Sequence, residues 1–201
     1  MNRLLRLPIL SLSILLAGCV SSGKSVETDY YVLSSPQLAD QKLAHGDIKV
    51  IALGPITFAD YLKRASIVER NSSVNIKVSN VKQWAGNIEN EFQIALLKHF
   101  TNLDSRYLYV KHPSMLNTRP LRRLRVDILR FDVKLDGPAR LEAVWAWLDQ
   151  HGEVVAAGNF SRTSRAESTH AGAVSAMSAL LQQFSTEVHQ ALTAAAGSKR
   201  S

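Results

Sequence analysis

The sequence predicts an α+β fold: a mixed, largely antiparallel sheet with two main helices packed on one face. Three observations support this prediction. Residues 121–165 contain three strand-like stretches joined by two tight turns, which indicates an antiparallel meander. Apolar residues recur every three or four positions in residues 88–103 and again in residues 171–196, which indicates two amphipathic helices. The other strand candidates are short and come mostly from the first half of the chain.

The first half of the folded region consists of short predicted elements. Apolar runs bounded by Gly, Pro, Asn or Ser indicate strands, and a polar turn separates the last two of them. In order, these elements are a strand at Tyr30–Leu33, a buried strand at Ile48–Leu53 that ends at Gly54-Pro55, a helical turn at Asp60–Lys63, and a strand pair at Ile67–Arg70 and Val74–Val78.

The first helix is predicted from Ile88 onward. Asn87 can cap it, because its side-chain oxygen can accept hydrogen bonds from the free N–H groups of the first turn. Charged residues lie between the apolar positions, so one face of the helix should pack on the sheet. The apolar positions are Ile88, Phe92, Ala95, Leu96 and Leu103. A short strand at Tyr107–Val110 follows.

The longest strand candidate, Leu121–Leu135, changes its alternation midway. Val126 and Ile128 share one parity, whereas Phe131 and Val133 share the other. A β-bulge near Leu129 reconciles the two halves, because a bulge inserts one extra residue into a strand.

Two further strands and the second helix complete the predicted fold. Turns at residues 136–138 and 150–152 lead into the strands Arg140–Asp149 and Val154–Arg165, and the Ala-rich segment Ala171–Ala196 forms a long helix laid on the sheet. Trp145 and Trp147 lie two positions apart and therefore face the same side. Core packing under the helices explains this pair better than stacking on a ligand.

The N-terminus carries an export signal. Arg3 and Arg6 precede an apolar segment of residues 7–17, which is shorter than the ~20 residues that span a bilayer. Leu16-Ala17-Gly18-Cys19 resembles the lipobox of exported bacterial lipoproteins, a likeness that implies a diacylglycerol on the Cys19 thiol and cleavage before it. We therefore expect a signal peptide at residues 1–18, a lipidated tether at residues 19–28 and a single domain at residues 29–197.

Composition narrows the classes of function. The formal net charge of +7 includes Arg3 and Arg6, so the mature chain is only mildly basic. The cluster Arg119, Arg122, Arg123 and Arg125 has no aromatic residues between its members, so a solvated strand edge explains it better than binding to nucleic acid. A hydrophobic fraction of 46% argues against disorder. Cys19 is the single cysteine, so a lipidated chain has no thiol left for a disulfide.

No pattern in the chain predicts a catalytic or metal site. There is no G-x-S-x-G elbow, and the six histidines lack the spacing of metal ligands. Asp127 and Asp132 are five residues apart, which places them on opposite faces of an ideal strand unless the bulge intervenes. Residues 18–25 match the phosphate-binding pattern G-x-x-x-x-G-K-[ST], but an export signal precedes them in place of the required buried strand. We therefore predict that the protein is not an enzyme.

Several segments, taken in their order along the chain, resemble the ABC-type transport auxiliary lipoproteins. The likeness covers nearly all of the mature chain. It rests on Tyr30–Leu33, Gly54-Pro55-Ile56, Tyr61-Leu62, Ile67–Arg70, Trp84-Ala85, Val126–Phe131, Leu141–Trp145 and the helix around residues 173–180. The resemblance implies a fold similar to the N-terminal domain of TolB, no catalytic residues, and no cofactor apart from the covalent lipid on Cys19.

The resemblance also implies a location and partners. It implies an outer-membrane lipoprotein that faces the periplasm and works beside an MCE-domain protein and its inner-membrane transport components. Val20 and Ser21 after the cysteine favour the outer membrane, because Asp there favours retention at the inner membrane. A homo-oligomer is left open.

The predicted role is docking. Tyr61, Arg70 and Trp84 are the candidate partner-binding residues, because aromatic and Arg side chains serve as anchors in interfaces. The alternative for these three residues is that they stabilise the loops of the first half. The alternative for the whole protein is a periplasmic lipid-binding carrier, which requires an apolar cavity between the sheet and the helices.

Overall fold

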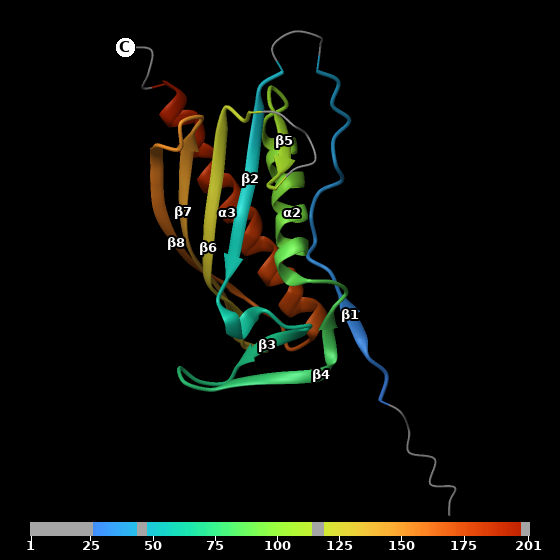
Figure 1. Cartoon of the computed structure of the whole chain (residues 1–201). Helices are drawn as coiled ribbons and strands as arrows, with labels where there is room; N and C mark the ends of the chain where they lie inside the picture. Colours follow the sequence, from blue (N-terminus) through green and yellow to red (C-terminus); the bar gives the residue numbers. More distant parts are fainter. Residues whose placement is uncertain (1–25, 44–47, 114–118, 198–201) are drawn as a thin grey trace, which may run out of the picture.

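The structure is a computed structural model that describes residues 26–43, 48–113 and 119–197. Within these residues the chain forms one mixed sheet, two α-helices and a 3-10 turn (Figure 1). The elements are β1 (Asp29–Tyr31), β2 (Val50–Phe58), η2 (Asp60–Leu62), β3 (Ser66–Arg70), β4 (Ile76–Trp84), α2 (Ile88–Leu103), β5 (Leu108–Lys111), β6 (Arg122–Val133), β7 (Pro138–Asp149), β8 (Val154–Arg165) and α3 (His170–Gly197). The predicted α+β class is confirmed.

The strands lie in the order β1-β4-β3-β6-β2-β5, and β7 and β8 extend the sheet from β6. The β6–β7 and β7–β8 ladders are antiparallel and are the longest in the sheet, as the predicted meander requires. The β3–β4 pair is also antiparallel, whereas β2 pairs with β5 and β6 in parallel, and β1 with β4. Strand β6 is therefore central, since β2, β3 and β7 all pair with it.

Both α-helices cover the same face of the sheet (Figure 1). Asn87 caps α2 as predicted, since its side-chain oxygen accepts from the N–H groups of Glu89 at 2.8 Å and Asn90 at 3.3 Å. Between helices and sheet, the fully buried Phe92 ring lies 5.5 Å from Phe58, 5.6 Å from Phe131 and 6.1 Å from Phe184, measured between ring centroids. Aromatic rings at such distances stabilise each other beyond the area they bury.

A bulge interrupts β6 between Ile128 and Arg130, where the sequence predicts it. Val126 and Ile128 on one side of the bulge and Phe131 and Val133 on the other all enter the core. Without the extra residue, half of the strand would turn its apolar side chains to solvent.

Strand β2 is longer than predicted. It passes through Gly54-Pro55 with a register shift and continues to Phe58. Gly54 has φ of 122°, and a Cβ there would lie 2.7 Å from the carbonyl oxygen of His112, so glycine is required. The Gly-Pro pair bends the strand instead of ending it.

Residues 32–43, which we call the strap, connect β1 to the segment before β2 and run beside α2 (Figure 1). The amide N–H of Ser34 donates to Ser178 Oγ on α3 at 2.9 Å. Further along, Gln41 Nε2 donates to the carbonyl oxygens of Ser105 at 2.6 Å and Tyr107 at 2.8 Å. These bonds fix the strap over the helical layer.

Candidate functional site

Tyr61 and Arg70, two of the predicted partner-binding residues, lie together on the side of the sheet away from the helices. The turn η2 places Tyr61 there because the side chain of the next residue, Leu62, is buried in the core. Arg70 ends β3, and its guanidinium carbon lies 5.8 Å from the centre of the Tyr61 ring. This is a cation–π contact. The Tyr61 hydroxyl donates to the carbonyl oxygen of Leu129 at 3.4 Å, in the bulge of β6.

A buried carboxylate fixes this arrangement. Asp132 on β6 is 1% exposed, and its Oδ2 accepts from Arg70 Nε at 2.7 Å. Arg130 Nε lies 3.1 Å and 3.0 Å from the two carboxylate oxygens of Asp132. Two guanidinium groups thus compensate the buried charge, as burial of an ion demands.

The same network reaches the next strand and the neighbouring turn. Glu142 on β7 lies 3.5 Å from a guanidinium nitrogen of Arg140 and 3.9 Å from one of Arg130. Arg70 also donates to the carbonyl oxygen of Ser73 at 3.2 Å, in the turn between β3 and β4. Arg70 therefore joins β3, the β3–β4 turn and β6, so the predicted loop-stabilising role applies to it as well.

Burial and a nearby negative charge change the pKa of the Tyr61 phenol. Partial burial, followed by the negative charge of Asp132, raises the pKa of Tyr61 above its ordinary value. The hydroxyl thus stays protonated at neutral pH and remains a hydrogen-bond donor.

Two exposed apolar side chains lie on β6 and β7, the strands that carry the acidic residues of this network. Leu129 in the bulge is 53% exposed, and Val144 on β7 is 46% exposed. We use "Tyr61 surface" for Tyr61, Arg70, Leu129 and Val144. An aromatic ring, an Arg and two exposed aliphatic side chains form the kind of patch that protein partners bind.

Trp84 does not belong to this surface. It is 4% exposed and lies in the core at the end of β4, which is longer than predicted. Its amide N–H donates to the carbonyl oxygen of Ala65 at 2.6 Å, and it pairs with Tyr31 in the β1–β4 ladder. The structure therefore corrects the prediction for Trp84: it packs the core and presents almost no surface to a partner.

The bulge in β6 also determines on which face of the strand the carboxylates of Asp127 and Asp132 lie. Asp127 and Asp132 both face away from the helices, because each lies between core residues and the bulge separates them. The Asp127 carboxylate accepts from the hydroxyl of Thr57, whereas Asp132 is bound by two arginines. Each carboxylate thus has its own structural partner.

Two histidines occupy positions that the sequence analysis did not single out. His99 on α2 and His189 on α3 are 8% and 9% exposed. The burial of His99 was predictable from the helical spacing, because His99 follows Leu96 by three residues and Phe92 by seven on the buried face of α2. Within the described residues, no group of three His, Cys, Asp or Glu side chains could hold a metal ion.

Two observations bear on the predicted attachment to a membrane. Cys19, the predicted lipidation site, lies outside the described residues. Among the residues that the structure does describe, neither helix has the length and apolar character needed to cross a membrane.

The fold is a single-sheet α+β module with both α-helices on one face, and comparison with known proteins identifies its family. The model of the ABC-type transport auxiliary lipoprotein component matches residues 31–189, so the chain belongs to this family. A curated relative, the intermembrane transport lipoprotein PqiC of Escherichia coli strain K12, is 25% identical over 142 residues, which are 70% of this chain and 72% of PqiC. PqiC of Shigella flexneri matches to the same extent.

Solved structures support the fold. A crystal structure of a Xanthomonas campestris protein assigned to the family DUF330 superposes with a TM-score of 0.66 at 19% identity, covering 86% of this chain and 99% of that one. A second crystal structure, of an uncharacterised protein, gives a TM-score of 0.68 at 16% identity, covering 82% of this chain and 98% of that one. The chain is thus an ABC-type transport auxiliary lipoprotein component with the fold of these solved structures.

Proposed function

We propose that this lipoprotein is held at the outer membrane by acyl chains on Cys19, faces the periplasm, and docks without catalysis onto an MCE-domain protein of a lipid-transport system. Its family and the name of its curated relatives support a transport role. The lipobox supports the anchor, and Val20 and Ser21 support the outer membrane. Two or more acyl chains suffice for stable anchoring.

The observation that carries the docking proposal is the Tyr61 surface. The Tyr61 ring is held between the Arg70 guanidinium and the β6 bulge, so little side-chain entropy is lost when a partner binds it. The exposed side chains of Leu129 and Val144 supply apolar area beside it. The buried Asp132 keeps Arg70 in place.

The position of this surface fits a membrane-anchored role. Strands β1, β3 and β4 lie at the same end of the molecule (Figure 1). The tether joins the fold at β1, and η2 and β3 carry Tyr61 and Arg70. A tether of ten residues reaches at most ~35 Å. A partner bound at the Tyr61 surface is therefore held close to the membrane.

The lipid-carrier alternative requires an apolar cavity between sheet and helices. The fully buried rings of Phe92, Trp147, Phe160 and Phe184 occupy this space. The docking function is therefore the better supported of the two.

The test uses the full-length lipoprotein in its native envelope. A photo-crosslinking residue at position 61 should capture the MCE protein, and Tyr61→Ala or Arg70→Ala should lower the amount co-purified by about tenfold, the effect of losing one interface anchor. Arg165→Ala is the matched control, because Arg165 is an exposed arginine whose nearest ion-pair partner, Asp136, lies 3.9 Å away. Cys19→Ala should release the protein from the membrane.

Capture of a second copy of this chain at position 61, with no MCE protein, would identify the surface as a self-association interface and overturn the docking proposal. Equal co-purification by Arg70→Ala and Arg165→Ala would also contradict it. Lipid recovered by native mass spectrometry from the purified protein would revive the carrier alternative.

A further inference from the structure

The sequence predicts that four arginines near the start of β6 belong to a solvated strand edge, and this prediction is wrong. They are Arg119, Arg122, Arg123 and Arg125. Strand β6 is central, because β2 and β7 pair with it on either side. Arg123, for example, lies between Ala52 of β2 and Leu148 of β7. An interior strand needs no charge to keep other strands away, so the arginines require a different explanation.

Two of these arginines face away from the helices. Leu124 and Val126 enter the core, so Arg123 and Arg125, which alternate with them, point to the opposite side of the sheet. Two positions along a strand are roughly 7 Å apart, so the two positive charges are neighbours. The residues directly opposite them on β7 are uncharged, although a cross-strand neighbour is a favourable place for a counter-charge.

No carboxylate of the described residues forms an ion pair with this cluster. Every ion pair of an arginine in that part of the chain involves an arginine outside the cluster. Asp127, two positions beyond Arg125, accepts from a threonine hydroxyl of β2. Asp149 accepts from the N–H groups of His151 at 2.8 Å and Glu153 at 3.1 Å, and so stabilises the β7–β8 turn.

A pocket of about 250 Å³ lies between the start of β6 and the β7–β8 turn. Arg119 and Arg123 line it, together with Leu148, Asp149 and Gln150 among others. Arg119 Nη2 donates to the carbonyl oxygen of Gln150 at 3.2 Å, which holds this guanidinium beside the turn. The Nε atom of Arg123 is buried and has no hydrogen-bond partner within the described residues. The side chain of Arg123 is therefore packed on the sheet, and its terminal nitrogens are the atoms that a ligand in the pocket meets.

The charge of Arg123 acts on a neighbouring side chain. Burial, followed by the positive charge of Arg123, lowers the pKa of His112 below its ordinary value. A half-buried guanidinium without an ion-pair partner is unfavourable in the free protein, and an anion that enters the pocket compensates it.

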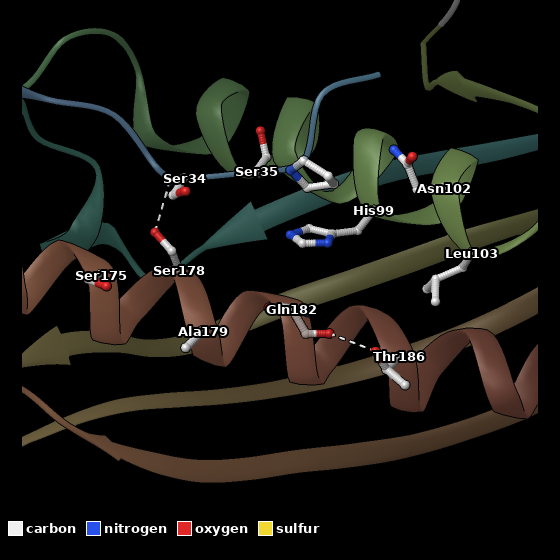
Figure 2. Close-up of a pocket in the computed structure, with 11 residues that line it drawn as sticks. Ser34, Ser35, His99, Asn102, Leu103, Ser175, Ser178, Ala179, Gln182 and Thr186 are labelled. Atoms are coloured by element: carbon white, nitrogen blue, oxygen red, sulfur yellow. Dashed lines mark hydrogen bonds between the residues drawn. The ribbon is translucent and has the colours of Figure 1, made fainter. Parts of the chain in front are cut away.

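The groove between α2, α3 and the strap offers no such charge. Its volume is about 530 Å³, and none of its eleven described lining residues is Lys, Arg, Asp or Glu (Figure 2). Its polar side chains hold the strap instead, as Ser178 Oγ does when it accepts from the amide N–H of Ser34 at 2.9 Å. Of the two hollows, only the arginine pocket selects a ligand by negative charge.

The arginine pocket lies at the end of the sheet opposite to the tether (Figure 1). Strand β6 runs from Arg122 at this end to Val133, which pairs with Glu69 of β3 at the other end. A strand of twelve residues is roughly 35 Å long. With Cys19 held at the membrane, as proposed, this end of the sheet points away from the membrane. A periplasmic protein therefore reaches the pocket more readily than the headgroups of the anchoring membrane do.

From these observations we infer that the pocket of Arg119 and Arg123, with Arg125 beside it, binds an acidic segment of a partner protein. Guanidinium groups pair with the Asp or Glu carboxylates of that segment, because their planar donors match a carboxylate. The inference rests on the proposed function only for the direction in which the pocket faces. Tyr61 and Arg70 lie at the other end of the sheet, so the two sites can be tested separately.

The test measures the binding of fluorescein-labelled hexaglutamate to the full-length lipoprotein in phosphatidylcholine nanodiscs by fluorescence anisotropy. Arg119→Gln and Arg123→Gln should each weaken binding by about tenfold, the effect of losing one guanidinium–carboxylate pair. Arg165→Gln is the matched control, because it removes the same charge from an exposed arginine whose partner Asp136 lies 3.9 Å away. It should weaken binding by less than about twofold.

Melting temperatures separate binding from folding. Arg119 is exposed and Arg123 has no ion pair to lose, so without peptide both variants should melt as the native chain does. Saturating hexaglutamate should raise the melting temperature of the native chain and of Arg165→Gln, and should leave that of Arg123→Gln almost unchanged.

Three outcomes overturn the inference. Equal weakening by Arg165→Gln and Arg123→Gln would show attraction by net charge alone. Glycerol phosphate that binds more tightly than hexaglutamate, and loses affinity in the Arg119 and Arg123 variants, would assign the pocket to a phospholipid headgroup. Absence of hexaglutamate binding, with the crosslink at position 61 intact, would remove this site and leave the docking proposal standing. Loss of that crosslink alone would refute the docking proposal and leave the arginine pocket.

Discussion

The indole N–H of Trp147 donates to the carbonyl oxygen of Val188 at 2.9 Å and so joins strand β7 to helix α3. Trp145 lies two residues earlier on the same inner face, but its Nε1 has no hydrogen-bond partner within the described residues. Trp147 is 0% exposed and Trp145 is 7% exposed. The predicted core role of both tryptophans is thus confirmed, and they differ in one hydrogen bond.

This pair of tryptophans gives the first prediction. Trp147→Phe loses the bond to Val188, whereas Trp145→Phe removes a donor that is unpaired. We expect Trp147→Phe to lower the free energy of unfolding by about 1 kcal/mol more than Trp145→Phe, measured by urea denaturation. Equal losses of unfolding free energy in the two variants would show that the change in ring volume alone determines the destabilisation.

The second prediction concerns the carboxylate beneath the Tyr61 surface. Asp132→Ala leaves Arg70 and Arg130 without their common partner in a buried setting, so it should lower the free energy of unfolding by about 3–5 kcal/mol. Asp60→Ala is the control. The Asp60 side chain is 96% exposed and pairs with Lys63, so its loss should change stability by less than about 0.5 kcal/mol. Similar values for the two variants would contradict the network.

A third prediction follows from a close approach in β8. A Cβ on Gly158 would lie 2.9 Å from Cζ2 of the buried Trp145 ring. Gly158→Ala should therefore lower the free energy of unfolding by about 1–3 kcal/mol and alter the near-UV circular dichroism of tryptophan. Gly152→Ala is the comparison, since a Cβ added to Gly152 would meet no atom within 4 Å, although the φ of this residue is 88°. Its cost of about 1 kcal/mol should leave the tryptophan signal unchanged.

The fourth prediction concerns pH. Burial lowers the pKa of both His99 and His189, which is 6.5 in the absence of such effects. The unfolded chain therefore binds more protons below about pH 6.5, so this part of the stability is complete above that pH and is lost as pH falls. Urea denaturation between about pH 7.5 and pH 5 should show the decline, and His99→Leu should reduce its slope. An unchanged slope would mean that His99 does not titrate in this range.

Local patterns predicted most of the elements. The bulge near Leu129 was predictable because two sets of apolar residues of opposite parity must share one core. The end of β2 was predicted wrongly: Gly54-Pro55 commonly ends a strand, but here residues 56–58 resume pairing with β6 after a register shift. The parallel pairing of β2 with β6 joins residues far apart in the chain, and no local pattern encodes that choice.

The candidate site was predictable only in part. Tyr61 and Arg70 were chosen by residue type, and the structure brings them together. Their common support, Asp132, is 62 residues from Arg70, a separation that sequence spacing does not resolve. Trp84 was chosen by residue type as well, but it lies at the end of β4, beyond the predicted strand end at Val78, and is buried in the core.

The edge strand β1 has a mechanical consequence. The tether enters the fold at β1, which pairs with β4 through three residues. The next contact along the chain is the hydrogen bond between Ser34 and Ser178. If Cys19 anchors the chain and a partner pulls from the opposite direction, the whole load passes through this short ladder. A force along the strand axis loads all the β1–β4 hydrogen bonds at the same time instead of breaking them one after another. Even a short pair of strands therefore withstands considerable tension.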